Sequence, residues 1–212
     1  MEKKIIYTNV SKKIKKDMIL DNISLSLDMG KNYGIYGTNG SGKTMFLRSI
    51  CGLMTVEGTI QIDTIKDIGN KNFPNSLGLL IENPSFINEF TGFENLKLLS
   101  FISKSIGDDT INQVIATVGL NPKDKRKYKK YSLGMKQRLG IAQAIIGGPD
   151  LIVLDEPTNG LDEDGINLLI KIIHSMEEST FIIASHDKEF LKHVTQTHFK
   201  MAHGKLNEAS LW

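Results

Sequence analysis

The amino-acid sequence predicts an α/β fold, with a mostly parallel sheet flanked by helices, an N-terminal antiparallel β subdomain and a helical insert. Residues 151–154 and 181–184 are apolar on both faces, as parallel strands covered by helices should be. Residues 4–9 and 22–27 instead alternate apolar and polar side chains, which is typical of half-exposed antiparallel strands. From about residue 91 to 118, apolar residues recur at helical spacing, which predicts the insert.

The remaining elements follow from shorter patterns in chain order. A short apolar run at 33–36 predicts a buried strand, and the apolar spacing after residue 43 predicts a helix. Further strands are expected at 59–63 and 77–81, further helices at about 136–146, 165–176 and 188–193, and a small hairpin around Gly204.

A glycine-rich loop lies between the strand at 33–36 and the helix that follows it. It fits the phosphate-binding pattern G-x-x-x-x-G-K-[ST] at every fixed position. The glycines allow backbone angles that turn successive N–H groups toward phosphates, and the helix N-terminus adds partial positive charge. Lys43 would reach the β- and γ-phosphates, and Thr44 would bind Mg²⁺. The pattern predicts a P-loop nucleoside triphosphatase core whose nucleotide-binding residues are Gly37, Thr38, Asn39, Gly40, Ser41, Gly42, Lys43 and Thr44.

Polar side chains follow two of the expected parallel strands. Asp155 and Glu156 come directly after the strand at 151–154, at the edge where open parallel sheets bind ligands. Asp155 can hold Mg²⁺ through its water shell, and Glu156 can polarise a water for attack on the γ-phosphate. The strand at 181–184 brings His186 to the same edge, where it could hydrogen-bond the γ-phosphate and the attacking water.

Length and composition favour one domain with an insertion. The 212 residues allow one substantial core, which we assign to 1–82 and 148–212, with 83–147 as a helical subdomain.

The 26 basic and 24 acidic residues give a net charge of +2. The lysine-rich runs at 12–16 and 123–130 lack interleaved aromatic residues, so we expect solvated surface and no nucleic-acid partner. No apolar run is long enough to cross a bilayer, and the single cysteine, Cys51, is expected to be a buried thiol in a cytoplasmic protein.

One segment carries a resemblance to a known family. Residues 131–142 read Tyr-Ser-Leu-Gly-Met-Lys-Gln-Arg-Leu-Gly-Ile-Ala and stand some twenty residues before the acidic strand. This segment resembles the signature of ATP-binding cassette (ABC) transporter nucleotide-binding subunits, commonly Leu-Ser-Gly-Gly-Gln followed by a basic helix. Ser132 and Gly134 keep that pattern, while Leu133 and Met135 depart from it. The variant is similar to that of the bacitracin-resistance and lantibiotic self-protection exporters.

The resemblance implies a dimer of cassettes, either a homodimer or a heterodimer with a second cassette, packed head to tail around two ATP molecules. Each ATP would contact residues 37–44 of one subunit and Ser132 and Gly134 of the other. Asp162 matches the acidic residue of the loop that crosses the dimer, and His186 matches the switch histidine of the family.

Two positions depart from the family pattern. Glu82 stands where the family usually has a glutamine that senses Mg²⁺, and a carboxylate can bind the ion as the amide does while adding negative charge. The family commonly stacks an aromatic ring on adenine near the N-terminus, where this chain has Ile14, with Tyr7 as a weak substitute.

The sequence therefore predicts the ATPase subunit of an exporter, with ATP and Mg²⁺ as cofactors and a separate membrane-spanning permease as partner. Such a subunit would lie on the inner face of the plasma membrane through that permease, with residues 82–94 as its contact zone. Peptide antibiotic export or immunity is the implied role. The alternative is a soluble ABC ATPase that acts on nucleic acid or ribosomes, although such proteins usually carry paired cassettes, a coiled-coil insert or zinc cysteines. A P-loop GTPase would need a guanine-reading Asn-Lys-x-Asp motif, which the sequence lacks.

Overall fold

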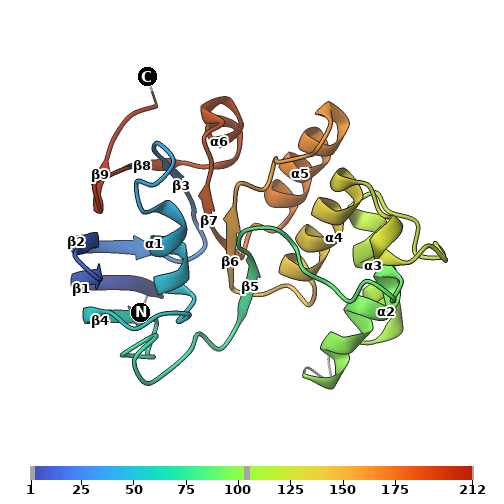
Figure 1. Cartoon of the computed structure of the whole chain (residues 1–212), viewed down its shortest axis with the longest axis horizontal. Coiled ribbons are helices and arrows are strands. Elements are labelled where there is room, and N and C mark those ends of the chain that lie inside the picture. The colour runs from blue at the N-terminus through green and yellow to red at the C-terminus, as the bar shows by residue number, and fades with distance from the viewer. Residues whose placement is uncertain (1–2, 103–105, 212) are drawn as a thin grey trace.

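The computed structural model describes residues 3–102 and 106–211, and it confirms the expected α/β class (Figure 1). A six-stranded sheet forms the centre, in the order β5-β6-β7-β3-β8-β9. Its strands pair in parallel except for the last pair, in which β9 runs antiparallel to β8. The strands are β3 (Asn32–Tyr36), β5 (Leu77–Leu80), β6 (Leu151–Asp155), β7 (Thr180–Ala184), β8 (Thr197–Ala202) and β9 (Lys205–Glu208).

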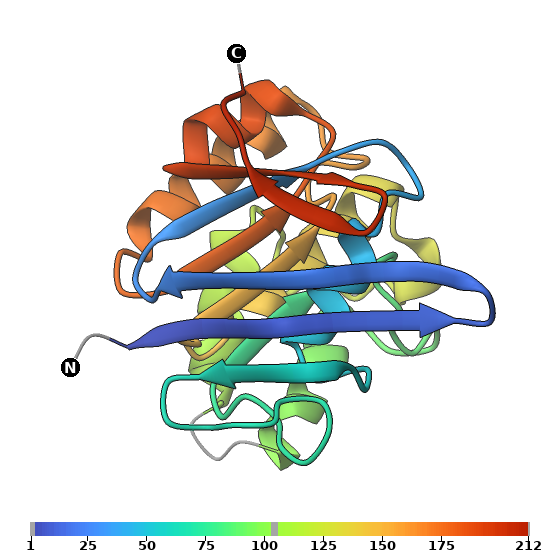
Figure 2. The same ribbon diagram turned by 90° about the vertical axis from the view of Figure 1, so that its left-hand side faces the viewer.

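The N-terminal strands form a separate antiparallel sheet, as the alternating pattern predicts. In it β1 (Lys4–Ile14) lies between β2 (Asp17–Asp28) and β4 (Glu57–Ile62), and Figure 2 shows these long strands face on. Buried residues such as Ile5 and Ile60 point to the interior, and the hairpin tip lies at the far end of β1.

The first core lies between the two sheets around α1 (Lys43–Ile50). Phe46 and Leu47 of this helix are buried against alternate residues of the parallel strands, among them Val153 and Ile182. Cys51, at the end of α1, is buried as expected, and burial raises the pKa of its thiol to about 12.

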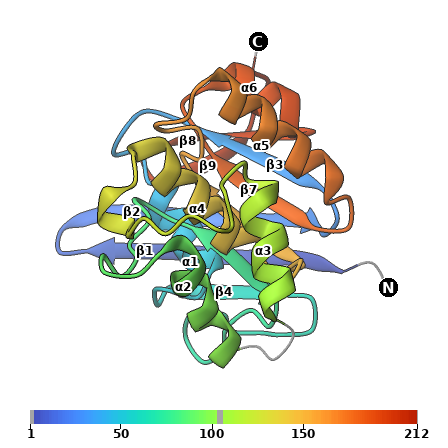
Figure 3. The same cartoon turned by 90° about the vertical axis from the view of Figure 1, so that its right-hand side faces the viewer.

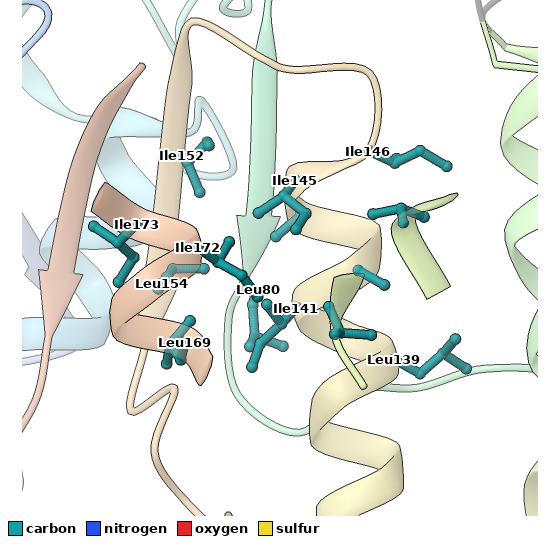
Figure 4. Close-up of a cluster of buried hydrophobic side chains, with 14 of the residues drawn as sticks. Leu80, Leu139, Ile141, Ile145, Ile146, Ile152, Leu154, Leu169, Ile172 and Ile173 are labelled. Atoms are coloured by element: carbon teal, nitrogen blue, oxygen red, sulfur yellow. The ribbon is translucent and has the colours of Figure 1, made fainter. Parts of the chain in front are cut away.

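The second core covers the opposite face of the parallel sheet. The intervening strand residues, including Ile152, Leu154 and Ile183, pack there against α4 (Leu133–Ile145) and α5 (Glu163–Ser175), as Figure 4 shows for part of the cluster. The apolar side chains of β6 and β7 are thus buried in one core or the other, which explains why neither strand alternates apolar with polar residues.

The helical insert gathers at one end of the molecule, where α2 (Gly92–Lys97), α3 (Asp108–Thr117) and α4 lie together (Figure 3). Short 3₁₀ turns at Leu98–Phe101 and Tyr128–Lys130 complete it. The helical pattern expected from 91 to 118 is therefore divided between separate helices, and its residues 103–105 lie outside the described part of the chain.

Capping residues set the helix starts that apolar spacing placed too late. Helix α4 begins at Leu133 rather than near residue 136, because the Ser132 hydroxyl caps it by accepting from the Met135 N–H at 3.2 Å. Helix α5 begins at Glu163 rather than at 165, since Asp162 accepts from the Gly165 N–H at 3.0 Å.

The C-terminal region follows the same capping rule and adds one pairing that the sequence pattern does not predict. Asp187 caps α6 (Lys188–Val194), where the pattern predicted a helix over 188–193. The hairpin around Gly204 is present, but its strand β8 also extends the parallel sheet by pairing with β3. Throughout the described ranges, the helices are too short or too polar to span a membrane.

Helix α4 packs directly on β5 at a glycine. A Cβ atom at Gly78 would lie 1.6 Å from the carbonyl oxygen of Ala144. We expect Gly78→Ala to lower the free energy of unfolding by about 3 kcal/mol, because the helix backbone must move away from the strand. Urea denaturation measures this change. Gly107→Ala is the control, since a Cβ atom there meets no atom within 4 Å, and a Gly78→Ala loss as small as the control's would contradict the close packing.

Candidate nucleotide-binding and hydrolysis site

The site lies at the carboxyl ends of β3, β6 and β7. Parallel pairing places Asp155 opposite Ala184, and Ala184 opposite Ile35, so the loops that follow the three strands leave the sheet together. A cavity of about 470 Å³ opens at this edge. It is lined by Ile19, Asn39, Gly40, Gly42, Lys43, Thr44, Met45, Asp155 and Glu156.

The glycine loop has a conformation that glycine alone can adopt without strain. Gly40 and Gly42 have φ angles of 77° and 110°, in the left-handed region. At Gly37, a Cβ atom would lie 2.3 Å from the carbonyl oxygen of Met201. The fixed glycines of the motif therefore allow the loop to curl against the sheet and lead into α1, whose N-terminus faces the cavity.

Lys43 is folded back into this loop. Its Nζ atom donates to the carbonyl oxygens of Gly37 at 2.8 Å and Thr38 at 3.4 Å, and it lies 3.9 Å from Glu156 Oε1. The buried hydroxyl of Ser41 has no hydrogen-bond partner among the residues that the structure describes. A buried cation and an unpaired hydroxyl in a curled loop fit an anionic ligand such as a phosphate chain.

Thr44 and Asp155 meet across the site. The Thr44 hydroxyl donates to Asp155 Oδ2 at 2.6 Å. Burial raises the pKa of Asp155 and the nearby Glu156 charge adds to this effect, while the Thr44 hydrogen bond opposes it. A buried carboxylate beside a hydroxyl offers hard oxygen ligands, and Mg²⁺ needs few of these because it keeps several waters. The donor set fits Mg²⁺.

Glu156 is held by the loop that follows β7. Its Oε2 atom lies 2.7 Å from His186 Nδ1, and it accepts from the His186 N–H at 3.2 Å and the Ser185 hydroxyl at 3.3 Å. The Glu156 backbone has a φ angle of 47°, which is unusual for a residue with a side chain. The structure thus brings Glu156 and His186 together, as the sequence predicts, and adds Ser185, which no motif indicated.

The signature residues form a second group outside the cavity. Ser132 is exposed at the start of α4, and a Cβ atom at Gly134 would lie 2.8 Å from the carbonyl oxygen of Gly160. Asp162 Oδ1 accepts from Arg138 Nη2 at 3.0 Å, and the pKa of Asp162 is lowered by its hydrogen bond from the Gly165 N–H and by Arg138. Ser132, Gly134 and Asp162 are therefore close to one another, and within this chain they do not line the phosphate-loop cavity.

Glu82 stands beside the site rather than in it. Its Oε1 atom accepts from Arg48 Nη2 at 2.9 Å, its side chain is 59% exposed, and it has a φ angle of 61°. It does not line the cavity, although its charge is near enough to raise the pKa of Asp155 slightly. Its expected role as a metal ligand stays a prediction.

The suggestion that Tyr7 stacks on adenine is wrong. The Tyr7 ring is 2% exposed and stacks on Phe46 at a centroid distance of 5.1 Å, and its hydroxyl lies 3.0 Å from Ser49 Oγ. The ring belongs to the core because β1 alternates inward and outward residues. Ile14 is 41% exposed at the hairpin tip, and the nearby Ile19 lines the cavity, which the sequence analysis did not predict.

The fold and the site together define a P-loop nucleotide hydrolase with a helical insert. Residues 20–159 match the family model described as ABC transporter. The chain belongs to the ABC transporter family, as an ATP-binding ATPase subunit.

Relatives and a solved structure agree with this assignment. The chain is 45% identical over 201 residues to the ABC transporter ATP-binding protein YybJ of Bacillus subtilis, covering 93% of this chain and 92% of that protein. It is 36% identical to the lantibiotic transport ATP-binding protein SrtF of Streptococcus pyogenes, over 88% of this chain and 81% of that protein. It is 34% identical to the bacitracin transport ATP-binding protein BcrA of Enterococcus faecalis, over 98% of this chain and 69% of that protein. The dimeric, post-hydrolysis structure of the cassette MJ0796 with ADP and Pi shares the fold. The TM-score is 0.85 and the sequence identity 24%, over 98% of this chain and 99% of that one.

Two carboxylates should give stability effects of opposite sign as pH changes. The raised folded-state pKa of Asp155 means that it stabilises the fold when protonated, and this contribution is lost as pH rises through the folded pKa. We expect Asp155→Asn to be more stable than the wild type at neutral pH without nucleotide, with the difference shrinking toward pH ~4.

Asp162 is the matched control for this pH experiment. Its lowered folded-state pKa means that its contribution is present above the unfolded pKa and lost as pH falls through the folded pKa. Asp162→Asn should therefore be less stable than the wild type at neutral pH. Urea denaturation at several pH values measures both differences. A stabilising Asp162→Asn or a destabilising Asp155→Asn at neutral pH would contradict the expected signs.

Proposed function

We propose that this protein is the ATPase subunit of an exporter for a peptide antibiotic of the bacitracin or lantibiotic kind, acting with a separate membrane permease. The observation that carries the proposal is a set of contacts at one edge of the sheet. Thr44 hydrogen-bonds Asp155, and both Lys43 and His186 lie against the Glu156 carboxylate. The transport relatives, named for lantibiotics and bacitracin, supply the class of cargo.

In the proposed site the glycine loop, residues 37–44, holds the triphosphate. The backbone N–H groups and the N-terminus of α1 bind the phosphates, and Lys43 exchanges its carbonyl partners for β- and γ-phosphate oxygens. Thr44 and Asp155 hold Mg²⁺, which supplies positive charge to the phosphates when bound. Glu82 pairs with Arg48 through Oε1 and does not line the cavity, so we assign it a lesser role in metal binding.

Glu156 acts as the general base in the proposed reaction. A water between its carboxylate and the γ-phosphate would transfer a proton to Glu156 as it attacks in line, and ADP and phosphate would leave. His186 holds the carboxylate through Nδ1 and is largely exposed, so its ring is free to turn toward the γ-phosphate. Ser185 and the His186 N–H keep Glu156 aimed while the ring moves.

A second cassette completes the proposed site. Ser132 and Gly134 do not reach the cavity of their own chain, but the exposed N-terminus of α4 is suited to a γ-phosphate presented by a partner subunit. The absence of a side chain at Gly134 keeps that helix end close to residues 159–162, which would cross the dimer. The structural neighbour MJ0796 is described as dimeric with ADP and Pi bound, which supports this arrangement.

The proposed permease contact lies along residues 82–94. A groove of about 340 Å³ opens beside this segment and reaches α4. Its walls combine aromatic and polar groups, so it suits an amphipathic segment of a membrane protein and would hold this subunit at the inner face of the plasma membrane. The lining residues are Asn83, Pro84, Ser85, Phe86, Asn88, Tyr128, Leu133, Lys136 and Gln137.

Replacement of the proposed base separates binding from turnover. We expect Glu156→Gln to bind ATP and form ATP-bound dimers while its ATPase rate falls at least ~100-fold, because the amide cannot accept the proton. Phosphate release measures the rate, and size-exclusion chromatography with ATP and Mg²⁺ measures the dimer. Glu163→Gln, in the exposed first turn of α5, is the control and should leave the rate unchanged. Normal hydrolysis by Glu156→Gln would remove Glu156 from the role of base.

A pull-down tests the transporter assignment. Tagged Glu156→Gln protein, trapped with ATP and Mg²⁺, should co-purify with a multispanning membrane protein from detergent-solubilised membranes of the source cell. Asn88 is exposed and lines the groove, so adding Asn88→Arg should abolish that capture without loss of the ATP-bound dimer. Recovery of ribosomal proteins or nucleic acid alone would overturn the transport proposal and leave the ATPase chemistry standing.

A further inference from the structure

We propose that Gln137 is a positioning residue. It fixes the backbone of Glu156, so that the direction of the Glu156 carboxylate depends on the position of helix α4. This inference rests on the proposed role of Glu156 as the general base. The sequence motifs indicate functions for Ser132 and Gly134 nearby but none for Gln137.

The contacts of Gln137 point away from its own helix. The side chain is 5% exposed, and its Nε2 atom donates to the carbonyl oxygens of Pro157 at 3.0 Å and Glu156 at 3.3 Å. Both acceptors belong to the turn that follows β6. A buried amide that donates both hydrogens to one turn of another element fixes the turn relative to the helix.

The Glu156 turn needs such support because of its backbone conformation. Glu156 has a φ angle of 47°, a region that side chains favour only when surrounding contacts hold it. Its N–H donates to Ala184 O at 2.8 Å, and its carbonyl oxygen also accepts from the Asn159 N–H at 3.1 Å. Gln137 is the contact in this set that comes from the helical insert. The direction of the Glu156 carboxylate therefore depends on where α4 lies.

Gln137 also lines the groove beside residues 82–94. The same cavity touches Phe86, Tyr128 and Lys136, so one side chain lies between a surface hollow and the proposed base. Any shift of α4 on occupation of this groove moves the amide that holds Glu156. Gln137 thereby links the groove to the turn of the proposed base through two parallel hydrogen bonds, one of them to Glu156 itself.

The first experiment removes the amide donors and keeps the side-chain length. Gln137→Met should lower kcat for ATP about 10- to 100-fold with KM for ATP unchanged, because the phosphates are still bound while the base is misaimed. Hydrogen–deuterium exchange should show faster exchange at the Asn159 amide, whose acceptor is the Glu156 carbonyl. Gln143→Met is the matched control, since Gln143 lies on the same helix but lines a different cavity, away from Glu156.

A pH profile distinguishes positioning from packing. Gln137→Glu places a carboxyl group against two carbonyl oxygens. When ionised this group has no hydrogen to donate, and when protonated it regains one donor. The kcat deficit of Gln137→Glu relative to the wild type should therefore shrink as pH falls, whereas a deficit caused by altered packing would not depend on pH. This comparison also applies if Gln137→Met folds poorly.

The outcomes separate this inference from the proposed function. If Gln137→Met matches Gln143→Met in kcat and in Asn159 exchange while Glu156→Gln is inactive, the base assignment stands and the inference about Gln137 is overturned. A loss confined to KM, or a Gln137→Glu deficit that does not change with pH, overturns it as well. Normal turnover by Glu156→Gln would remove the base assignment and this inference together.

Discussion

The register of three parallel strands determines where the chemistry of this protein can occur. β7 lies between β6 and β3, and Ala184 pairs with Asp155 on one side and Ile35 on the other. A slip of one residue would turn every side chain of a strand to the opposite core and would carry its terminal polar residue away from the common edge. Burial on both faces prevents this slip, because Val153 fits the core around α1 and Leu154 fits the core under α4. The apolar strands therefore fix the polar site.

The buried charged groups of the site lower the stability that this packing provides. Asp155 is buried beside the Glu156 carboxylate, and its raised pKa reflects the cost of keeping that charge away from water. Lys43 lies within the glycine loop and donates to carbonyl oxygens, which only partly satisfy a buried cation. These groups share a need for a ligand of complementary charge, Asp155 for a cation and Lys43 for an anion. The charges of the site thus suit a phosphate–metal pair.

The sequence predicted those features that local chemistry determines. The glycine loop, the carboxylates at the end of β6 and the antiparallel opening all follow from residue type and period, and the structure has them where they were expected. It did not predict contacts that depend on how distant elements pack. Tyr7 reads as a polar ring on a half-exposed strand, yet Phe46 of α1 covers it. Ser185 and Gln137 carry no motif in relation to Glu156, and only the packing of β7 and α4 against the end of β6 brings them there.

Helix α4 connects parts of the molecule that would otherwise act separately. Arg138 of this helix donates to the carbonyl oxygen of Val118, at the end of α3, and to Asp162 before α5, while Gln137 holds the turn after β6. Near its other end, the Ala144 carbonyl leaves no room for a side chain at Gly78 of β5. The Ala144 end of the helix is therefore packed against the strand, while the groups nearest its Ser132 end are the turn of Glu156 and the loop of Asp162. The position of the helical insert thus bears on both the turn that carries the proposed base and the loop that would cross the dimer.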